Sequence, residues 1–137
     1  MLRVVIDPNV FVSAVITPDG VPAQIVRAAL ERDFHLVVSP ALIGELVDVF
    51  ARPKLRPYTD GEQAQTLIDG ILGVAELRND PPPSDTAVRD PNDAYLCALA
   101  DAEEADVLVS GDQDLFAARL MTAAVLTPRA FLDKLEE

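Results

Sequence analysis

The chain has 137 residues, half of them hydrophobic and a quarter charged, with a net charge of -12 at pH 7. This size and composition predict a single domain over residues 1–137 with a core of its own, and exclude a disordered chain. Cys97 is the only cysteine, which excludes an internal disulfide and a thiolate zinc cluster. No apolar run reaches the roughly 20 residues of a membrane helix, and residues 1–7 indicate a strand rather than a signal peptide, so we expect a soluble, cytoplasmic protein.

Apolar segments of β type alternate with helical patterns along the chain, as in α/β proteins with a parallel sheet. In chain order we predict a strand over 2–6, helices over 9–15 and 22–31, a strand over 34–38, a helix after Pro40, a helix after Thr59, a weak strand over 74–77, a helix after Pro91, strands over 106–109 and 124–126, and a helix after Pro128. Most of the strands are continuous apolar runs, which is typical of strands covered on both faces.

Several helix starts are marked by their local sequence. Three of them place an N-cap residue before a proline suited to the first helical position, namely Ser39-Pro40, Asp90-Pro91 and Thr127-Pro128. A fourth is indicated by Thr59 and Glu62, which lie at capping-box spacing. Residues 81–85, with three consecutive prolines, predict an extended loop.

Carboxylates follow or lie near the ends of several predicted strands. Asp7 comes directly after the first strand, and Asp112 and Asp114 follow the fourth. Asp93 lies near the start of one helix, and Glu45 lies about one turn into another, from where it can reach over the same edge. Because ligands of open parallel sheets bind outside the carboxyl ends of the strands, we expect these segments to bring their acids to one region.

Gathered carboxylates call for a cation. At an effective dielectric of about 20, two carboxylates some 4 Å apart repel by roughly 4 kcal/mol. Oxygen ligands without thiolates suit Mg²⁺ or Mn²⁺ better than zinc or copper, and such ions support in-line displacement at phosphorus. The net negative charge disfavours a generic nucleic-acid-binding protein, but this objection weakens where a bound cation reverses the local field.

Each acid also has an ordinary structural interpretation. Asp7 can cap the turn that follows it, and Asp93 can complement the positive end of its helix. A glutamate on a helix, such as Glu45, is commonly solvated, while Asp112 and Asp114 suit tight turns. Their shared position, rather than any one residue, favours the functional interpretation.

Other polar residues carry weaker signals. His35 is the only histidine and lies in an apolar strand, so a satisfied core or surface residue explains it better than a catalytic base. Its being alone excludes metal-binding His pairs and disfavours a Ser-His-Asp triad. The basic residues Arg52, Lys54 and Arg56 fit either contacts to RNA phosphates or a solvated surface loop. Cys97 reads as a small buried hydrophobe on a helix.

Four motifs follow one another along nearly the whole chain: Val5-Ile6-Asp7-Pro8-Asn9-Val10-Phe11-Val12-Ser13-Ala14, Val38-Ser39-Pro40 leading to Glu45, Arg89-Asp90-Pro91-Asn92-Asp93, and Val109-Ser110-Gly111-Asp112-Gln113-Asp114-Leu115. In this order and spacing they resemble the PIN-domain nucleases, and within them the VapC-like toxins of bacterial toxin-antitoxin systems. The resemblance implies a three-layer α/β fold with a central parallel sheet of about five strands in the order 3-2-1-4-5 flanked by helices, a Mg²⁺ or Mn²⁺ site, and endonucleolytic cleavage of RNA.

The resemblance also implies roles for individual residues. The catalytic acids would be Asp7, Glu45, Asp93 and Asp112, the metal ligands Asp7, Asp93, Asp112 and Asp114, and the supporting residues Asn9, Ser110 and Asp90. Glu45 would orient or deprotonate the attacking water. Pro8 stands where members usually carry Thr, and it supplies neither a hydroxyl nor a backbone donor. A homodimer and an antitoxin that covers the site are further implications.

Two other functions fit parts of the pattern. A phosphatase of the haloacid dehalogenase type would use Asp7 as nucleophile, but it needs a second Asp where this chain has Asn9, and a lysine at a strand end, where neither Lys54 nor Lys134 lies. A non-catalytic acidic binding module is the alternative of another class, although it has no need to keep all four acids.

Overall fold

The computed structural model describes residues 1–82, 91–116, 118 and 120–137. Within these residues, five parallel strands form one sheet in the order β3-β2-β1-β4-β5, which confirms the predicted architecture. The strands are β1 (Arg3–Ile6), β2 (His35–Val38), β3 (Glu76–Leu77), β4 (Val107–Val109) and β5 (Ala124–Leu126). The helices are α1 (Pro8–Ile16), α2 (Val21–Leu30), α3 (Pro40–Phe50), α4 (Gly61–Val74), α5 (Pro91–Ala102), α6 (Gln113–Phe116) and α7 (Pro128–Leu135), with a short 3-10 helix η1 (Pro53–Leu55) after α3.

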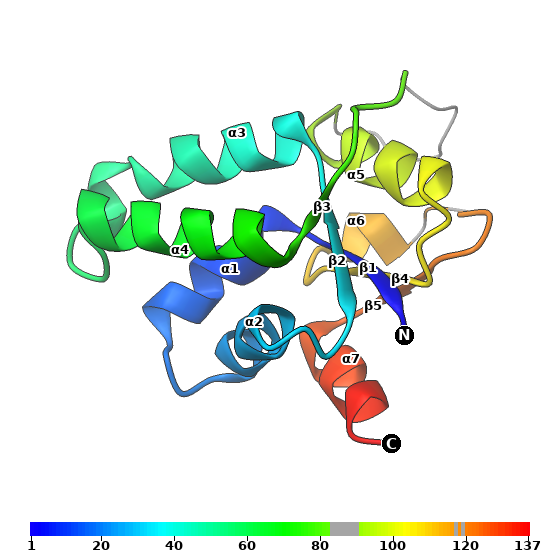
Figure 1. The fold of residues 1–137 in the computed structure, drawn as a ribbon, viewed down its shortest axis with the longest axis horizontal. Helices are drawn as coiled ribbons and strands as arrows, with labels where there is room; N and C mark the ends of the chain where they lie inside the picture. The colour runs from blue at the N-terminus through cyan, green and yellow to red at the C-terminus, as the bar shows by residue number, and fades with distance from the viewer. Residues whose placement is uncertain (83–90, 117, 119) are drawn as a thin grey trace.

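Helices cover both faces of the sheet, which explains why its central strands are continuously apolar. Helices α1 to α4 lie on one side, while α5 lies on the other and packs against β1 and β4 (Figure 1). Helix α7 packs against α2 and β5. Because α5 ends just before β4 begins, it runs back along the sheet, and its first turn lies at the carboxyl edge.

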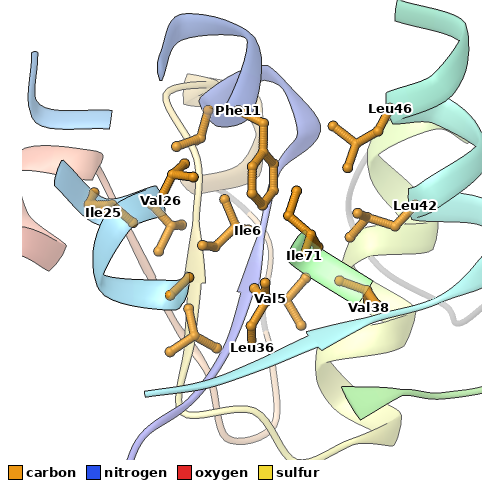
Figure 2. Packing of buried hydrophobic residues seen from close by; sticks show 14 of the residues in the cluster. Val5, Ile6, Phe11, Ile25, Val26, Leu36, Val38, Leu42, Leu46 and Ile71 are labelled. Carbon is orange, nitrogen blue, oxygen red and sulfur yellow. The ribbon is translucent and has the colours of Figure 1, made fainter. Parts of the chain in front are cut away.

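The buried face of α1 packs on the sheet. Figure 2 shows the ring of Phe11 over the sheet near Ile6, between Val26 of α2 and the α3 side chains Leu42 and Leu46. All five are buried, and burying such a side chain contributes roughly 1.5–3 kcal/mol. This packing holds the β1–α1 junction rigidly at the edge of the sheet.

The register of β1 and β4 brings two chain segments out of the sheet together. Ile6 pairs with Val109, so Asp7 and Ser110 are the next residues on neighbouring strands. The amide of Asp7 donates to the carbonyl oxygen of Val109 at 2.9 Å, which extends the ladder by one bond. The two residues therefore stand side by side at the carboxyl edge.

Two of the proline-marked helix starts are confirmed by their caps. The hydroxyl of Ser39 accepts from the amide of Leu42 at 3.3 Å, and the hydroxyl of Thr127 accepts from the amide of Ala130 at 3.0 Å. Helix α5 begins at Pro91 as predicted, while its expected cap, Asp90, lies outside the described residues.

The predicted capping box of Thr59 and Glu62 is wrong by one residue. Asp60 Oδ1 accepts from the amide of Gln63 at 2.7 Å, and Gln63 Oε1 accepts from the amide of Asp60 at 3.0 Å. An aspartate carboxylate is a stronger N-cap acceptor than a threonine hydroxyl, so the box forms at the second of two adjacent pairs with the same spacing.

The predicted strand over 74–77 is too long, because α4 continues through Val74 and β3 holds only Glu76 and Leu77. The amide of Ala75 donates to the carbonyl oxygen of Ile71 at 2.8 Å, which carries the helical ladder past the expected boundary. The remaining predicted strands, and the helices over 9–15 and 22–31, differ from the observed ones by at most one residue at either end. Residues 83–85 of the predicted loop lie outside the described residues.

Cys97 is buried on α5, as predicted. In the part of the chain that the structure describes, no helix is both long and apolar enough to cross a membrane.

Candidate active site

Asp7 is the buried acid at the end of β1. It caps α1, where its Oδ1 accepts from the amide of Asn9 at 3.0 Å. The whole residue is only 4% exposed. Pro8, in the first helical position, is also buried and suits this start, since its missing N–H has no partner to lose there. The ordinary capping role of Asp7 is thus real, and it leaves the second carboxylate oxygen for other contacts.

Ser110 connects that second oxygen to the end of β4. Its hydroxyl donates to Asp7 Oδ2 at 2.8 Å and accepts from the amide of Asp112 at 3.0 Å. Asp112 Oδ1 in turn accepts from the amide of Asp114 at 2.9 Å, so this residue caps the short helix α6. The fully buried Ser110 hydroxyl therefore links the carboxylate of Asp7 to the backbone of Asp112.

Burial and charge act against ionisation of Asp7. Desolvation raises the pKa of its carboxyl above the ordinary value, and the negative charge of Asp112 raises it further. Hydrogen bonds from the Asn9 amide and the Ser110 hydroxyl oppose this rise. A buried carboxylate with a like charge beside it is the arrangement that a bound cation would relieve.

A cleft of about 340 Å³ opens beside these two acids. Its lining comes from the β1–α1 junction, α1, the start of α2, the segment after β4 and the start of α7, and consists of Asp7, Asn9, Val10, Ser13, Pro22, Gly111, Asp112 and Pro128. Asn9 and Ser13 lie four residues apart and therefore share one face of α1. From the sequence alone Ser13 had no assigned role, although its spacing of four residues from Asn9 indicates that both lie on the face of α1 that lines the cleft.

Glu45 is held by a contact that the sequence did not predict. The hydroxyl of Tyr95, on α5, donates to Glu45 Oε2 on α3. Burial, together with the negative charges of Glu45, Asp7 and Asp80, raises the pKa of Tyr95 far above its ordinary value, so the phenol stays protonated. Asp80 itself accepts from the amide of Ala41 at 2.9 Å, in the first turn of α3.

Asp93 is buried in the first turn of α5, two residues before Tyr95. Since α5 packs against β1 and β4 with its first turn at their carboxyl edge, the fold delivers Asp93 to the edge that carries Asp7 and Asp112. Glu45 meets α5 through Tyr95. Asp114 is exposed on α6, and its amide rather than its carboxylate is the group that contacts Asp112.

The remaining candidates lie away from the cleft or outside the description. Arg52, Lys54 and Arg56 are exposed around η1, and His35 is exposed on β2. Asp90 lies outside the described residues.

The acids fit a hard, partly hydrated cation. Among the described residues, no three or more His, Cys, Asp or Glu side chains lie together so that they could hold a metal ion, so the predicted gathering of all the acids into one cluster is not seen there. Mg²⁺ is usually held by one or two carboxylates, with waters and substrate phosphate completing its octahedral shell. Asp7 and Asp112 supply such a pair, and a cage of dedicated ligands is not required.

These features define a class of protein, a parallel α/β domain with an acidic cleft at the carboxyl ends of neighbouring strands, where ligands of this architecture bind. The model of one family, the PIN domain, matches residues 3–114, and the chain belongs to this family. PIN domains are typically nucleases and generally use divalent metal ions.

The chain is also similar to a curated relative and to solved structures. An uncharacterized protein of Methanocaldococcus jannaschii is 28% identical over 145 residues, covering 99% of this chain and 93% of the relative. Among solved structures, VapBC2 of Rickettsia felis bound to a promoter DNA fragment matches with a TM-score of 0.62 and 15% identity, covering 90% of this chain and 98% of that chain. DNA-bound VapBC of Salmonella typhimurium matches with a TM-score of 0.61 and 12% identity, covering 93% of this chain and 99% of that chain. A protein of Pyrobaculum aerophilum matches with a TM-score of 0.64 and 15% identity, covering 98% of this chain and 90% of that chain. At these identities the structural likeness establishes the fold.

Proposed function

We propose that this protein is a Mg²⁺- or Mn²⁺-dependent endoribonuclease that hydrolyses RNA phosphodiester bonds in the cleft beside Asp7 and Asp112. The observation that carries the proposal is the Ser110 hydroxyl, which donates to the Asp7 carboxylate and accepts from the backbone amide of Asp112, and so links the two acidic residues at the ends of β1 and β4. Membership of the PIN-domain family supports the nuclease chemistry.

Asp7 and Asp112 are the proposed first ligands, with Asp93 reaching the same edge from α5 and Asp114 as an additional acid. A bound Mg²⁺ or Mn²⁺ would lower the pKa of a coordinated water and offset negative charge that develops on the phosphate. Glu45 is proposed to orient the attacking water or accept its proton. The oxygen of that water bonds to phosphorus as its proton passes to Glu45 or to solvent, and the bond from phosphorus to one ribose oxygen breaks as that oxygen takes up a proton from solvent.

The basic residues Arg52, Lys54 and Arg56 are proposed to contact the RNA backbone. They are exposed on a chain of net charge -12, so they offer a local positive patch where the overall field repels phosphate. Binding that depends on them weakens as salt rises, because each phosphate contact releases counterions.

We also propose that the protein is the toxin of a toxin-antitoxin pair and forms a homodimer. The likeness to VapBC structures supports this proposal through the fold. We expect expression of this protein alone to arrest growth, and co-expression with the product of a neighbouring reading frame to restore growth and inhibit cleavage. For the homodimer, light scattering should give twice the chain mass. Failure of co-expression to inhibit would remove the toxin assignment and leave the nuclease assignment in place.

The experiment that tests the nuclease is cleavage of end-labelled single-stranded RNA by the purified protein in Mg²⁺, in Mn²⁺ and in EDTA. We expect internal cuts with either metal and none in EDTA. Cleavage that survives EDTA would overturn the metal-dependent mechanism. If a varied set of RNAs stays intact in both metals, a non-catalytic binding module becomes the better account.

A further inference from the structure

Tyr95 joins two helices that carry proposed catalytic acids. It lies two residues after Asp93 on α5, and its hydroxyl donates to Glu45 Oε2, 50 residues earlier in the chain on α3. Both side chains are half-buried, and the start of α3 lies beside α5 at the top of Figure 1. The contact therefore spans the sheet edge rather than linking neighbours within one helix.

The partner of Glu45 is a neutral donor and not a cation. Among the described residues, the ion pairs involve Arg3, His35, Arg78 and their acidic partners, and none involves Glu45. An arginine or lysine would neutralise the carboxylate, whereas a phenol holds one oxygen and leaves the negative charge in place. The contact therefore orients the Glu45 carboxylate without pairing it with a positive charge.

The hydrogen bond also restricts a flexible side chain. A free glutamate populates several rotamers, and fixing one of them costs conformational entropy. The aromatic ring of Tyr95 is rigid and packs against the hydrophobic core. The Glu45 side chain is therefore ordered when the protein folds, before substrate binds.

We propose that Tyr95 is a positioning residue that holds the Glu45 carboxylate in one orientation. This inference deepens the proposed nuclease function and rests on it. The competing explanation is a structural one, in which Tyr95 merely links α3 to α5 and Glu45 takes no part in the reaction.

The test uses Tyr95→Phe, which removes the hydroxyl and keeps the ring. We expect kcat for RNA cleavage to fall about tenfold or more while KM changes less than twofold, because the group acts on orientation rather than on substrate binding. Tyr58→Phe is the matched control, since Tyr58 is the other tyrosine and is exposed before α4. It should leave kcat unchanged.

A double-mutant cycle shows whether Tyr95 acts through Glu45. In a Glu45→Gln background, Tyr95→Phe should cause no further loss of kcat, since the group it positions is already removed. The same four proteins should also show nonadditive changes in the free energy of unfolding, a measure of the contact that needs no activity.

The outcomes separate the two proposals. If Glu45→Gln lowers kcat and Tyr95→Phe does not, the positioning role is overturned and the nuclease stands. If Tyr95→Phe lowers kcat equally in the wild-type and Glu45→Gln backgrounds, or if the unfolding energies are additive, Tyr95 does not act through Glu45. If the wild-type protein cuts no RNA, the proposed function fails and the positioning role fails with it.

Discussion

The hydroxyl of Ser110 donates a 2.8 Å hydrogen bond to Oδ2 of Asp7, so one buried side chain fastens the end of β4 to the end of β1. The same hydroxyl accepts from the amide of Asp112, which sets the direction in which the chain leaves the sheet. Two carboxylates that repel each other are thereby held beside one cleft by a group that carries no charge.

Removing the Ser110 hydroxyl should weaken the link between Asp7 and Asp112. Ser110→Ala removes the donor to Asp7 and leaves the amide of Asp112 without its acceptor, so we expect a loss of about 1 kcal/mol or more in the free energy of unfolding. Because the Ser110 hydrogen bond lowers the pKa of Asp7, its loss should raise that pKa further. Carboxyl-carbon NMR of Asp7 in metal-free buffer measures the shift.

Ser39→Ala is the matched control for Ser110→Ala. Ser39 is also fully buried, and its hydroxyl also accepts from a backbone amide, but it caps α3. A similar loss of stability is expected, with no change in the pKa of Asp7. An equal pKa shift in both variants would mean that Ser110 has no specific effect on Asp7.

The buried charge of Asp7 should cost stability at neutral pH. Its pKa is raised by folding, so the folded state binds the proton more tightly than the unfolded state, and the cost is relieved as pH falls through the folded pKa. In EDTA, Asp7→Asn should therefore raise the free energy of unfolding at neutral pH, since Asn still caps α1. The gain should shrink toward acid pH. Denaturant unfolding at several pH values measures it, and a variant that is less stable at neutral pH would contradict the interpretation.

Much of this fold could be predicted because its signals are local. The central strands are continuous apolar runs, and the caps at Ser39 and Thr127 lie next to prolines. The errors occurred where two local choices were nearly equivalent. Thr59 and Asp60 each have a partner three residues on, and only the observed geometry shows that the stronger acceptor, Asp60, forms the box.

The site was predictable where strand ends determine it, and not where helices meet. The pairing of β1 with β4 follows from strand order, so the neighbouring positions of Asp7 and Ser110 could be expected once the order was assumed. The contact of Tyr95 with Glu45 depends on how α5 sits over the edge, and no spacing in the sequence encodes it. The cap that Asp80 provides for α3 was missed for the same reason.

A divalent cation should stabilise the folded protein through Asp7 and Asp112. At a free Mn²⁺ concentration of about 100 times Kd, binding to the folded state alone contributes roughly 2.7 kcal/mol. Thermal unfolding with and without Mn²⁺ should show this increase in the wild-type protein and lose it in Asp112→Asn. Asp48→Asn, an exposed acid on α3, should keep it. A rise of equal size in Asp112→Asn would place the cation elsewhere.

Glu104 offers a test of backbone strain far from the cleft. It lies two residues after the end of α5 with a φ of 51°, a left-handed conformation that favours glycine. Glu104→Gly should raise the free energy of unfolding by about 0.5–1 kcal/mol without changing cleavage. Arg32→Gly, at a φ of 62°, should gain less, because Arg32 Nη2 also donates to the carbonyl oxygen of Gly73 at 3.3 Å. Destabilisation by Glu104→Gly, measured in denaturant, would contradict this explanation.

The most direct test of the account is the rate of Mn²⁺-dependent RNA cleavage by Asp112→Asn compared with Asp48→Asn, each checked for folding by circular dichroism. Asp112 lines the cleft and its negative charge raises the pKa of Asp7, whereas Asp48 is exposed on α3. We expect Asp112→Asn to lose about 10²-fold or more of the wild-type rate, the scale of removing a group that stabilises transition-state charge, and Asp48→Asn to keep it. A folded Asp112→Asn protein that cuts RNA at the wild-type rate would show that the cleft beside Asp7 is not where the reaction takes place.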